Sequence, residues 1–253
     1  MKHYEKLLAL GCFTKADLEE ITGSEAAAKW LCREYQKKGY IERVKRDLYV
    51  AISLETQQPI ASRYAIASHI SDDAVVSYHS AFEFYGYANQ VFYETHVTSE
   101  SRFRDFDYDG VTYRRIAPRI TTGIAETNGI RVTTLERTVI DCINLFEKIG
   151  GLEELLRCIA LIPVLDESEL ADCLGEYESG FLYQKTGYIL STFADSLGIS
   201  DKFFELCKAN LPKGKSYLSD DTRGFVWHDE WKLYAPKNLE TMINKGVTDY
   251  DAI

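Results

Sequence analysis

Residues 14–51 contain two helical patterns separated by a glycine, followed by two segments in which apolar and polar residues alternate. This order constrains the fold more than any other feature of the sequence. Thr14 is a favourable helix N-cap, and Asp17 follows it at the spacing of a capping box. Gly23 provides the freedom in φ that a tight turn requires, and Ser24 can cap the next helix. The segment therefore predicts two short helices joined by a turn and followed by a β-hairpin.

The second of these helices, expected over Glu25–Lys38 with Gly39 as its left-handed C-terminal residue, has two chemically different faces. At 100° per residue, one face is apolar and would pack on the preceding helix. The apolar face consists of Ala27, Ala28, Leu31 and Tyr35. The opposite face would be exposed and consists of Lys29, Arg33, Gln36 and Lys37.

The hairpin is expected from Tyr40–Val44 and Leu48–Ile52, and its tip carries the basic residues Arg43, Lys45 and Arg46. From Lys29 to Asp47 the sequence has seven basic and three acidic residues, a local excess of four positive charges. Neutralising phosphates with such side chains releases counterions, and an exposed helix can contact base edges in the major groove. We therefore predict a winged helix-turn-helix that binds duplex DNA.

Two alternatives stay open for this segment. Basic helix faces are often simply solvated, and winged helices also serve as protein-binding modules. An N-terminal domain that binds protein would show the same pattern of helices and strands.

The helical and strand patterns along the chain predict an α+β protein. Its 253 residues exceed one typical domain, so two domains are expected, and its 45% hydrophobic residues suffice for a packed core. A polar segment at 53–59 ends in the first proline, which predicts a winged helix-turn-helix domain at 1–53 and a larger α+β domain at 59–253. The net charge of −10 divides into +1 for residues 1–60 and −11 for the remainder. The acidic part argues against a nucleic-acid surface along the full chain and suits a protein partner.

Turns and caps organise the second part of the chain. A helix is expected over 59–70, a short strand at Val75-Val76 and a small helix ending at Gly86. Asp109-Gly110 and Asn128-Gly129 predict two β-hairpins. Further helices are expected, with Thr133 and Glu136 as the capping box of the first, before a short β-rich tail and a helix near Leu239–Lys245. The other helical patterns cover 152–161, 167–177, 181–197 and 201–211.

The cysteines and histidines do not predict a metal or cofactor site. The six cysteines form no CxxC pair and mostly fall in apolar helical patterns, so we interpret them as small buried hydrophobes in a reducing cytoplasm. The five histidines are scattered singly, and a structural role for His79 is favoured over general-base chemistry. With no signal-peptide pattern and no apolar run near ~20 residues, a cytoplasmic protein without membrane contact is expected.

Four sequence motifs, taken together with the basic segment near the N-terminus, resemble the AbiEi-type antitoxins. These proteins are two-domain transcriptional regulators of a bacterial abortive-infection (type IV) toxin–antitoxin system. The match follows the same order over nearly the whole chain. The motifs are YHSAFEFYG at 78–86, VTTLERTVID at 132–141, LYQKTGYIL at 182–190 and WKLYAP at 231–236.

This resemblance implies an autorepressor that binds inverted repeats in operator DNA ahead of its own operon. It also implies that the larger domain counteracts a cognate nucleotidyltransferase toxin, without a stable complex being required. The implied DNA contacts are Lys29, Arg33 and Lys37 on the second helix and Arg43, Lys45 and Arg46 at the wing. One departure is Asp47, which stands where family members often have Gly, although Asp tolerates the left-handed region.

An enzyme is the alternative that the sequence supports less well. Asp220 and Asp221, followed by Glu230 and Lys232, form a loose D…E-x-K pattern that metal-dependent nucleases place on adjacent strands. The same residues belong to the WKLYAP region of the resemblance, and no phosphate-binding loop or nucleophile motif accompanies them. We therefore expect a protein without catalytic residues.

Overall fold

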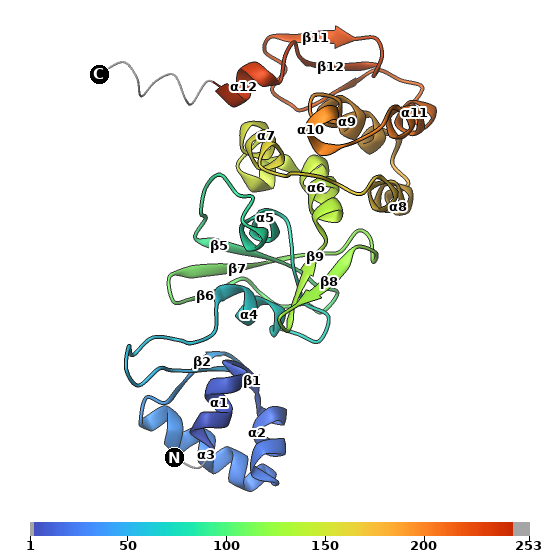
Figure 1. Cartoon of the computed structure of the whole chain (residues 1–253). Helices are drawn as coiled ribbons and strands as arrows, with labels where there is room; N and C mark the ends of the chain where they lie inside the picture. Colours follow the sequence, from blue (N-terminus) through green and yellow to red (C-terminus); the bar gives the residue numbers. More distant parts are fainter. Residues whose placement is uncertain (1–2, 245–253) are drawn as a thin grey trace, which may run out of the picture. The chain divides into compact units, whose positions relative to one another are not determined.

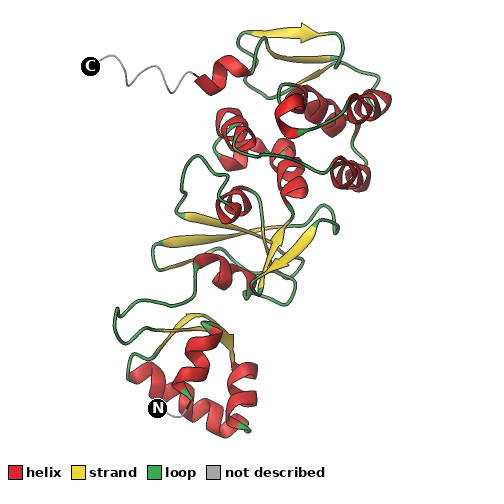
Figure 2. Cartoon of the chain, viewed as in Figure 1, coloured by secondary structure: helices red, strands yellow, loops and turns green. Residues whose placement is uncertain are grey.

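The computed structural model describes residues 3–244 and has a mixed α+β fold, as the sequence predicts (Figure 1 and Figure 2). Its residues form two compact units. Unit 1 comprises the chain up to Val76 with Phe92–Pro118 and Glu126–Val132, and unit 2 comprises Ser77–Val91, Arg119–Ala125 and the chain from Thr133 on. This division differs from the predicted ranges 1–53 and 59–253, because segments far beyond residue 59 pack with the N-terminal residues. Composition along the sequence carries no information about such long-range packing.

Unit 1 begins with three helices and a small antiparallel sheet. The helices are α1 (Tyr4–Leu10), α2 (Lys15–Thr22) and α3 (Glu25–Lys37), and the strands are β1 (Cys12–Thr14), β2 (Ile41–Lys45) and β3 (Leu48–Ala51). The strand order is β1-β3-β2. The sequence pattern predicted α2, α3 and the β2–β3 hairpin but not α1 and β1, which add a helix and a third strand.

The predicted caps of α2 and α3 are present. The Thr14 backbone N–H donates to the Asp17 carboxylate over 2.6 Å, and the Asp17 N–H donates to Thr14 Oγ1 over 3.4 Å, which completes the capping box. Gly23 ends α2 at φ 80°, and Ser24 Oγ accepts from the N–H of Ala27 at the start of α3. These local interactions position α3 against α2.

The packing of α3 explains which of its residues reach solvent. Its buried face consists of Ala28, Leu31, Cys32 and Tyr35. This face differs from the expected one at two residues, because Cys32 is buried and Ala27 is only half-buried. These side chains join a core that includes Leu18 of α2 and Ile41 of β2. A fully buried leucine such as Leu31 contributes about 2 kcal/mol of transfer free energy. The opposite face of α3 is therefore held outward.

A six-stranded mixed sheet follows. Its strands are β4 (Val75–Val76), β5 (Glu94–Thr98), β6 (Phe106–Tyr108), β7 (Val111–Ile116), β8 (Ile124–Thr127) and β9 (Ile130–Thr133). Their order is β6-β7-β5-β4-β9-β8, with β5 parallel to β7 and β4 parallel to β9. Both predicted hairpins are confirmed, because β6 pairs with β7, β8 neighbours β9, and the turn residues Asp109-Gly110 and Asn128-Gly129 all have positive φ. The helix expected over 59–70 is shorter, α4 (Arg63–Ser68), because Ser62 caps it.

Unit 2 is mostly helical. The pattern expected at 181–197 is divided into α9 and α10 by a break at Thr192 and Phe193, and Lys245 of the last predicted helix lies outside the described residues. The helices are α5 (His79–Tyr85), α6 (Leu135–Asn144), α7 (Leu152–Ala160), α8 (Glu167–Tyr177), α9 (Gly180–Ser191), α10 (Ala194–Leu197), α11 (Asp201–Ala209) and α12 (Glu240–Asn244), with a 3-10 turn at Phe146–Ile149. The strands β10 (Ser216–Tyr217), β11 (Phe225–His228) and β12 (Leu233–Pro236) form a sheet of order β10-β12-β11.

The cap predicted for α6 is wrong by one residue. Thr134, not Thr133, is the N-cap and accepts from the Arg137 N–H, because β9 continues through Thr133. Glu136 does not return to the cap, since its carboxylate accepts from the Asp166 N–H over 2.9 Å. A capping motif read from sequence cannot show that a strand extends into its first residue.

Arg137 and Asp141, four positions apart on α6, pair inside unit 2. Arg137 Nε donates to Asp141 over 3.4 Å, both residues are buried, and the Tyr177 hydroxyl donates to the same carboxylate. Burial raises the pKa of Asp141, while Arg137 and Tyr177 oppose that increase. The ERTVID segment therefore packs α6 in the interior.

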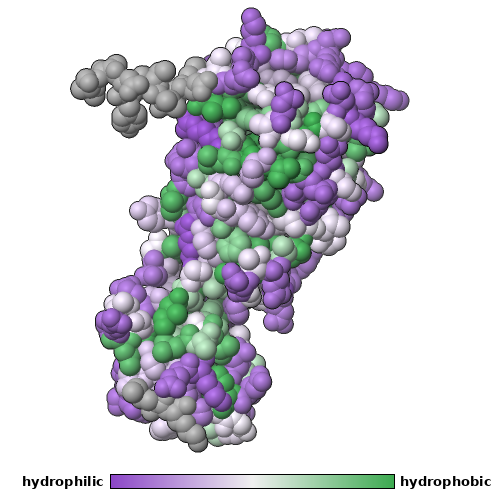
Figure 3. Space-filling view, in the orientation of Figure 1, coloured by the Kyte–Doolittle hydropathy of each residue, from purple (hydrophilic) through white to green (hydrophobic). Residues whose placement is uncertain are grey.

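The face drawn in Figure 3 shows hydrophobic patches bordered by hydrophilic residues. Within residues 3–244, no helix combines the length and the apolar character that crossing a bilayer requires.

Two glycines in unit 2 offer a matched test of its packing. A Cβ added at Gly187 of α9 would lie 2.1 Å from the Trp231 ring, whereas one added at Gly175 of α8 would meet no atom within 4 Å. We predict that Gly187→Ala lowers the free energy of unfolding by about 1–3 kcal/mol through overpacking. Gly175→Ala should raise it by about 0.5–1 kcal/mol by restricting the unfolded chain. Urea denaturation of both variants measures the difference, and equal stability would contradict the packing of Trp231 on α9.

Candidate nucleic-acid interface

The outward face of α3 contains the four residues predicted for it. Lys29, Arg33, Gln36 and Lys37 are all exposed. Lys29 Nζ lies 2.5 Å from the Glu25 carboxylate one turn earlier, and this hydrogen-bonded pair raises the pKa of Lys29. Exposed pairs of this kind contribute little, so the Lys29 ammonium can exchange Glu25 for a phosphate at small cost.

A groove of about 370 Å³ lies between α2 and α3 beside this face. Cys32 Sγ and Gln36 Oε1 are 3.4 Å apart, so the Gln36 amide is positioned by the helix that carries it. The groove thus places polar and cationic groups next to an apolar floor. Its lining residues are Lys15, Glu19, Ala28, Lys29, Cys32, Arg33 and Gln36.

The β2–β3 turn presents two of its three predicted basic residues to solvent. Arg43 and Arg46 are exposed, and Arg43 Nε donates to the Lys45 carbonyl over 3.1 Å. Asp47 adopts φ 67°, as expected for a residue that tolerates the left-handed region. Its carboxylate accepts from the Lys15 N–H over 3.3 Å, which ties the turn to the start of α2.

The side chain of the third residue, Lys45, points toward two phenylalanines of unit 1 and not toward solvent. Its Nζ lies 4.9 Å from the Phe103 ring centroid and 5.6 Å from that of Phe106, and it donates to the Ile70 carbonyl over 3.3 Å. Burial lowers the pKa of this ammonium. The strand register shifts between Arg43 and Lys45, and a bulge of this kind redirects side chains in a way that the sequence does not reveal. In this position the Lys45 ammonium is engaged by the protein and not presented to a phosphate.

Trp30 is a residue of α3 that the sequence analysis did not single out. It is 64% exposed, although tryptophan is usually well buried. It precedes Arg33 by three positions and Lys37 by seven, so the three side chains follow one stripe of the helix. The available clue was its position in the helical pattern, since Trp30 does not belong to the apolar set that contains Leu31 and Tyr35.

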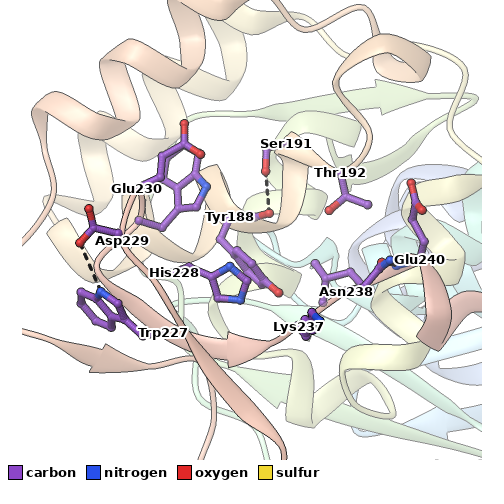
Figure 4. A pocket seen from close by; sticks show the side chains of 12 residues that line it. Tyr188, Ser191, Thr192, Trp227, His228, Asp229, Glu230, Lys237, Asn238 and Glu240 are labelled. Carbon is purple, nitrogen blue, oxygen red and sulfur yellow. Dashed lines mark hydrogen bonds between the residues drawn. The ribbon is translucent and has the colours of Figure 1, made fainter.

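A second hollow, of about 730 Å³, lies in unit 2 between α9, β11 and the chain before α12 (Figure 4). The rings of Tyr188 and His228 lie side by side there, with centroids 4.7 Å apart. Ser191 donates to the Tyr188 carbonyl, and His228 Nε2 lies 3.0 Å from the Pro236 carbonyl. Ser191 and His228 therefore do not form a nucleophile–base pair.

The D…E-x-K residues are engaged in other interactions. Asp221 pairs with Arg223 over 2.7 Å, and Glu230 pairs with Lys208 over 2.9 Å. Glu230 and Lys232 lie in the turn between β11 and β12, and Asp220 and Asp221 lie in a loop. Within residues 3–244, the group of His, Cys, Asp or Glu side chains close enough to share a metal lies elsewhere, at His79, Glu154 and Cys158. The arrangement does not favour the nuclease alternative.

Comparison with known proteins identifies a similar fold. No family model matches the sequence, and no curated protein matches it. Among solved structures, the chain is similar to the crystal structure of the RV2827C protein from Mycobacterium tuberculosis, with a TM-score of 0.63 and 15% sequence identity. The match covers 96% of this chain and 92% of that chain. At this identity the likeness shows the fold alone.

Lys45 and Arg46 form a matched pair for a test of the β2–β3 turn. We predict that Lys45→Ala lowers the free energy of unfolding by about 1 kcal/mol through loss of its aromatic contacts and leaves duplex affinity nearly unchanged. Arg46→Ala should leave stability within about 0.5 kcal/mol and weaken duplex binding. Thermal melts and fluorescence anisotropy with a labelled duplex distinguish the two effects. Equal losses of duplex affinity in both variants would contradict the inward placement of Lys45.

Proposed function

We propose that this chain is a DNA-binding transcriptional repressor whose N-terminal elements act as a winged helix-turn-helix. In this proposal α3 enters the major groove and the β2–β3 turn is the wing. The observation that carries the proposal is the outward face of α3, where Lys29, Arg33 and Lys37 lie opposite the buried face. The proposal includes no catalytic step.

The charge distribution supports a localised contact with DNA. The chain as a whole has a net charge of −10, so most of its surface would be repelled by a polyanion. The exposed cations of α3 and the β2–β3 turn are five: Lys29, Arg33, Lys37, Arg43 and Arg46. If all five neutralise phosphates, the logarithm of the binding constant should fall with the logarithm of salt at a slope of roughly −4 to −5.

We further propose that the chain is the antitoxin and autorepressor of a nucleotidyltransferase toxin. The first support is the ordered set of motifs that resembles those of the AbiEi-type antitoxins. The second is the acidic character of the residues after 60, which suits a protein partner. The operator would contain inverted repeats, and neutralisation would not require a stable complex with the toxin. Because unit 1 combines N-terminal residues with later strands, the two activities are best separated by substitutions in the full chain.

The first test removes cations from α3 without altering its core. We predict that Arg33→Ala combined with Lys37→Ala weakens binding to a duplex from upstream of the gene and makes the salt slope shallower by about 2. Lys202→Ala on α11 is the control, because it removes an exposed cation from unit 2 and should leave the slope unchanged. Anisotropy titrations at several salt concentrations provide the slopes.

The same α3 variant should still rescue cells that express the cognate toxin, because its substitutions lie outside unit 2. Loss of rescue in a folded variant would contradict the separation of the two activities. If the double substitution leaves the salt dependence of duplex binding unchanged, the result would instead favour N-terminal elements that bind protein.

Trp30 should contribute apolar contact and not charge. We predict that Trp30→Ala weakens duplex binding several-fold with the salt slope preserved, because no phosphate contact is lost. Trp227→Ala, which removes a tryptophan from unit 2, should have no effect on binding. An unchanged affinity for the Trp30 variant would show that this side chain remains in solvent in the complex.

A further inference from the structure

A buried polar cluster in unit 2 joins α5 to α7. His79 is the first residue of α5, and Glu154 and Cys158 lie one turn apart on the same face of α7. His79 and Cys158 are fully buried, and Glu154 is 2% exposed. His79 Nε2 lies 3.0 Å from Glu154 Oε1, and Cys158 Sγ lies 3.4 Å from the same oxygen. Three different kinds of metal-ligating atom thus converge in the interior.

A fourth side chain fixes the orientation of the imidazole. Glu83, one turn after His79 on α5, has Oε1 3.0 Å from His79 Nδ1. A carboxylate on one ring nitrogen directs the other nitrogen toward the remaining ligands, and metal-binding histidines usually have such a partner. Here the nitrogen directed toward Glu154 and Cys158 is Nε2.

Glu154 is oriented as well. Its second oxygen, Oε2, accepts from Gln90 Nε2 over 3.0 Å and from Asn89 Nδ2 over 3.3 Å. Asn89 and Gln90 are exposed residues that follow α5, so the cluster lies one side chain away from solvent. This loop offers an entry path for a small ion.

We propose that His79 Nε2, the Glu154 carboxylate and Cys158 Sγ form a binding site for Zn²⁺. The donor set of one imidazole, one carboxylate and one thiolate suits this ion, which binds nitrogen, oxygen and sulfur in tetrahedral geometry. Three protein ligands leave the fourth position for a water molecule. The site is independent of the proposed DNA binding.

The spacing of the ligand atoms fits this ion. Zinc bonds of roughly 2.0 to 2.3 Å at tetrahedral angles place pairs of ligand atoms roughly 3.3 to 3.5 Å apart. The two distances to Glu154 Oε1 are 3.0 and 3.4 Å, and all three ligand atoms lie within 4.8 Å of one another. Binding therefore needs only small side-chain movements.

In the hydrogen-bonded arrangement, protons occupy the positions that the ion would take. Binding transfers the Cys158 thiol proton, and the proton between His79 Nε2 and Glu154, to solvent, and three ligand-to-zinc bonds replace those hydrogen bonds. The divalent charge also offsets the carboxylates of Glu83 and Glu154. Zinc would then tie α5 to α7 and stabilise the folded chain by mass action.

Cobalt provides the direct test, because a Co²⁺–thiolate bond has a near-ultraviolet charge-transfer band that oxygen and nitrogen ligands do not produce. Tag-free, full-length protein is treated with a chelator and titrated with CoCl₂, then with ZnCl₂. We expect the band to saturate at one equivalent, zinc to displace cobalt, and the melting temperature to rise with added zinc.

Matched cysteine variants locate the site. Cys158→Ser should abolish the charge-transfer band, whereas Cys207→Ser, which changes another buried helical cysteine on α11, should retain it. Glu83→Gln should keep the band but weaken metal affinity about 10–100-fold, since it replaces the carboxylate that orients His79 and retains all three ligands. If Cys158→Ser fails to fold, the wild-type titration still decides. A wild-type chain without the band, or a folded Cys158→Ser variant that retains it, would show that the cluster is a hydrogen-bonded network only.

Discussion

The burial of one face of α3 determines what the N-terminal part of the chain can offer to a partner. Leu31 and Tyr35 pack with residues of α2 and β2 in a shared core, and the helix cannot rotate without exposing them. The opposite face is therefore fixed toward solvent together with Arg33 and Lys37. The orientation of the cationic residues thus follows from hydrophobic packing, and no interaction among the cations themselves is needed.

The β2–β3 turn is held by a different set of interactions, which limits its positive charge. Lys45 contacts two phenylalanines of unit 1, and Glu42 accepts from the Tyr108 hydroxyl over 2.9 Å. These contacts fix the turn relative to the later strands and engage the ammonium of one of its three cations within the protein. The same contacts explain why the N-terminal residues form one unit with strands that lie far along the sequence.

The sequence predicted features that depend on neighbouring residues and missed those that depend on distant ones. The Thr14 capping box, the turn at Gly23 and both glycine hairpins are local, because φ preferences and caps act within a few residues. Strand β9 includes Thr133, which was predicted to be a helix cap, and it pairs with the distant strand β4. The bulge beside Lys45 also depends on how β2 pairs with β3. Likewise, His79 and Cys158 are separated by 79 positions, so sequence spacing could not bring them together as metal ligands.

Hydrogen–deuterium exchange on the full chain, with and without a duplex from upstream of the gene, tests most directly whether α3 contacts DNA. We expect slower exchange in α3 and in the β2–β3 turn on adding duplex, and unchanged exchange in α6 and α9 of unit 2. Slower exchange confined to unit 2, or no change in α3 at saturating duplex, would contradict a contact between α3 and DNA.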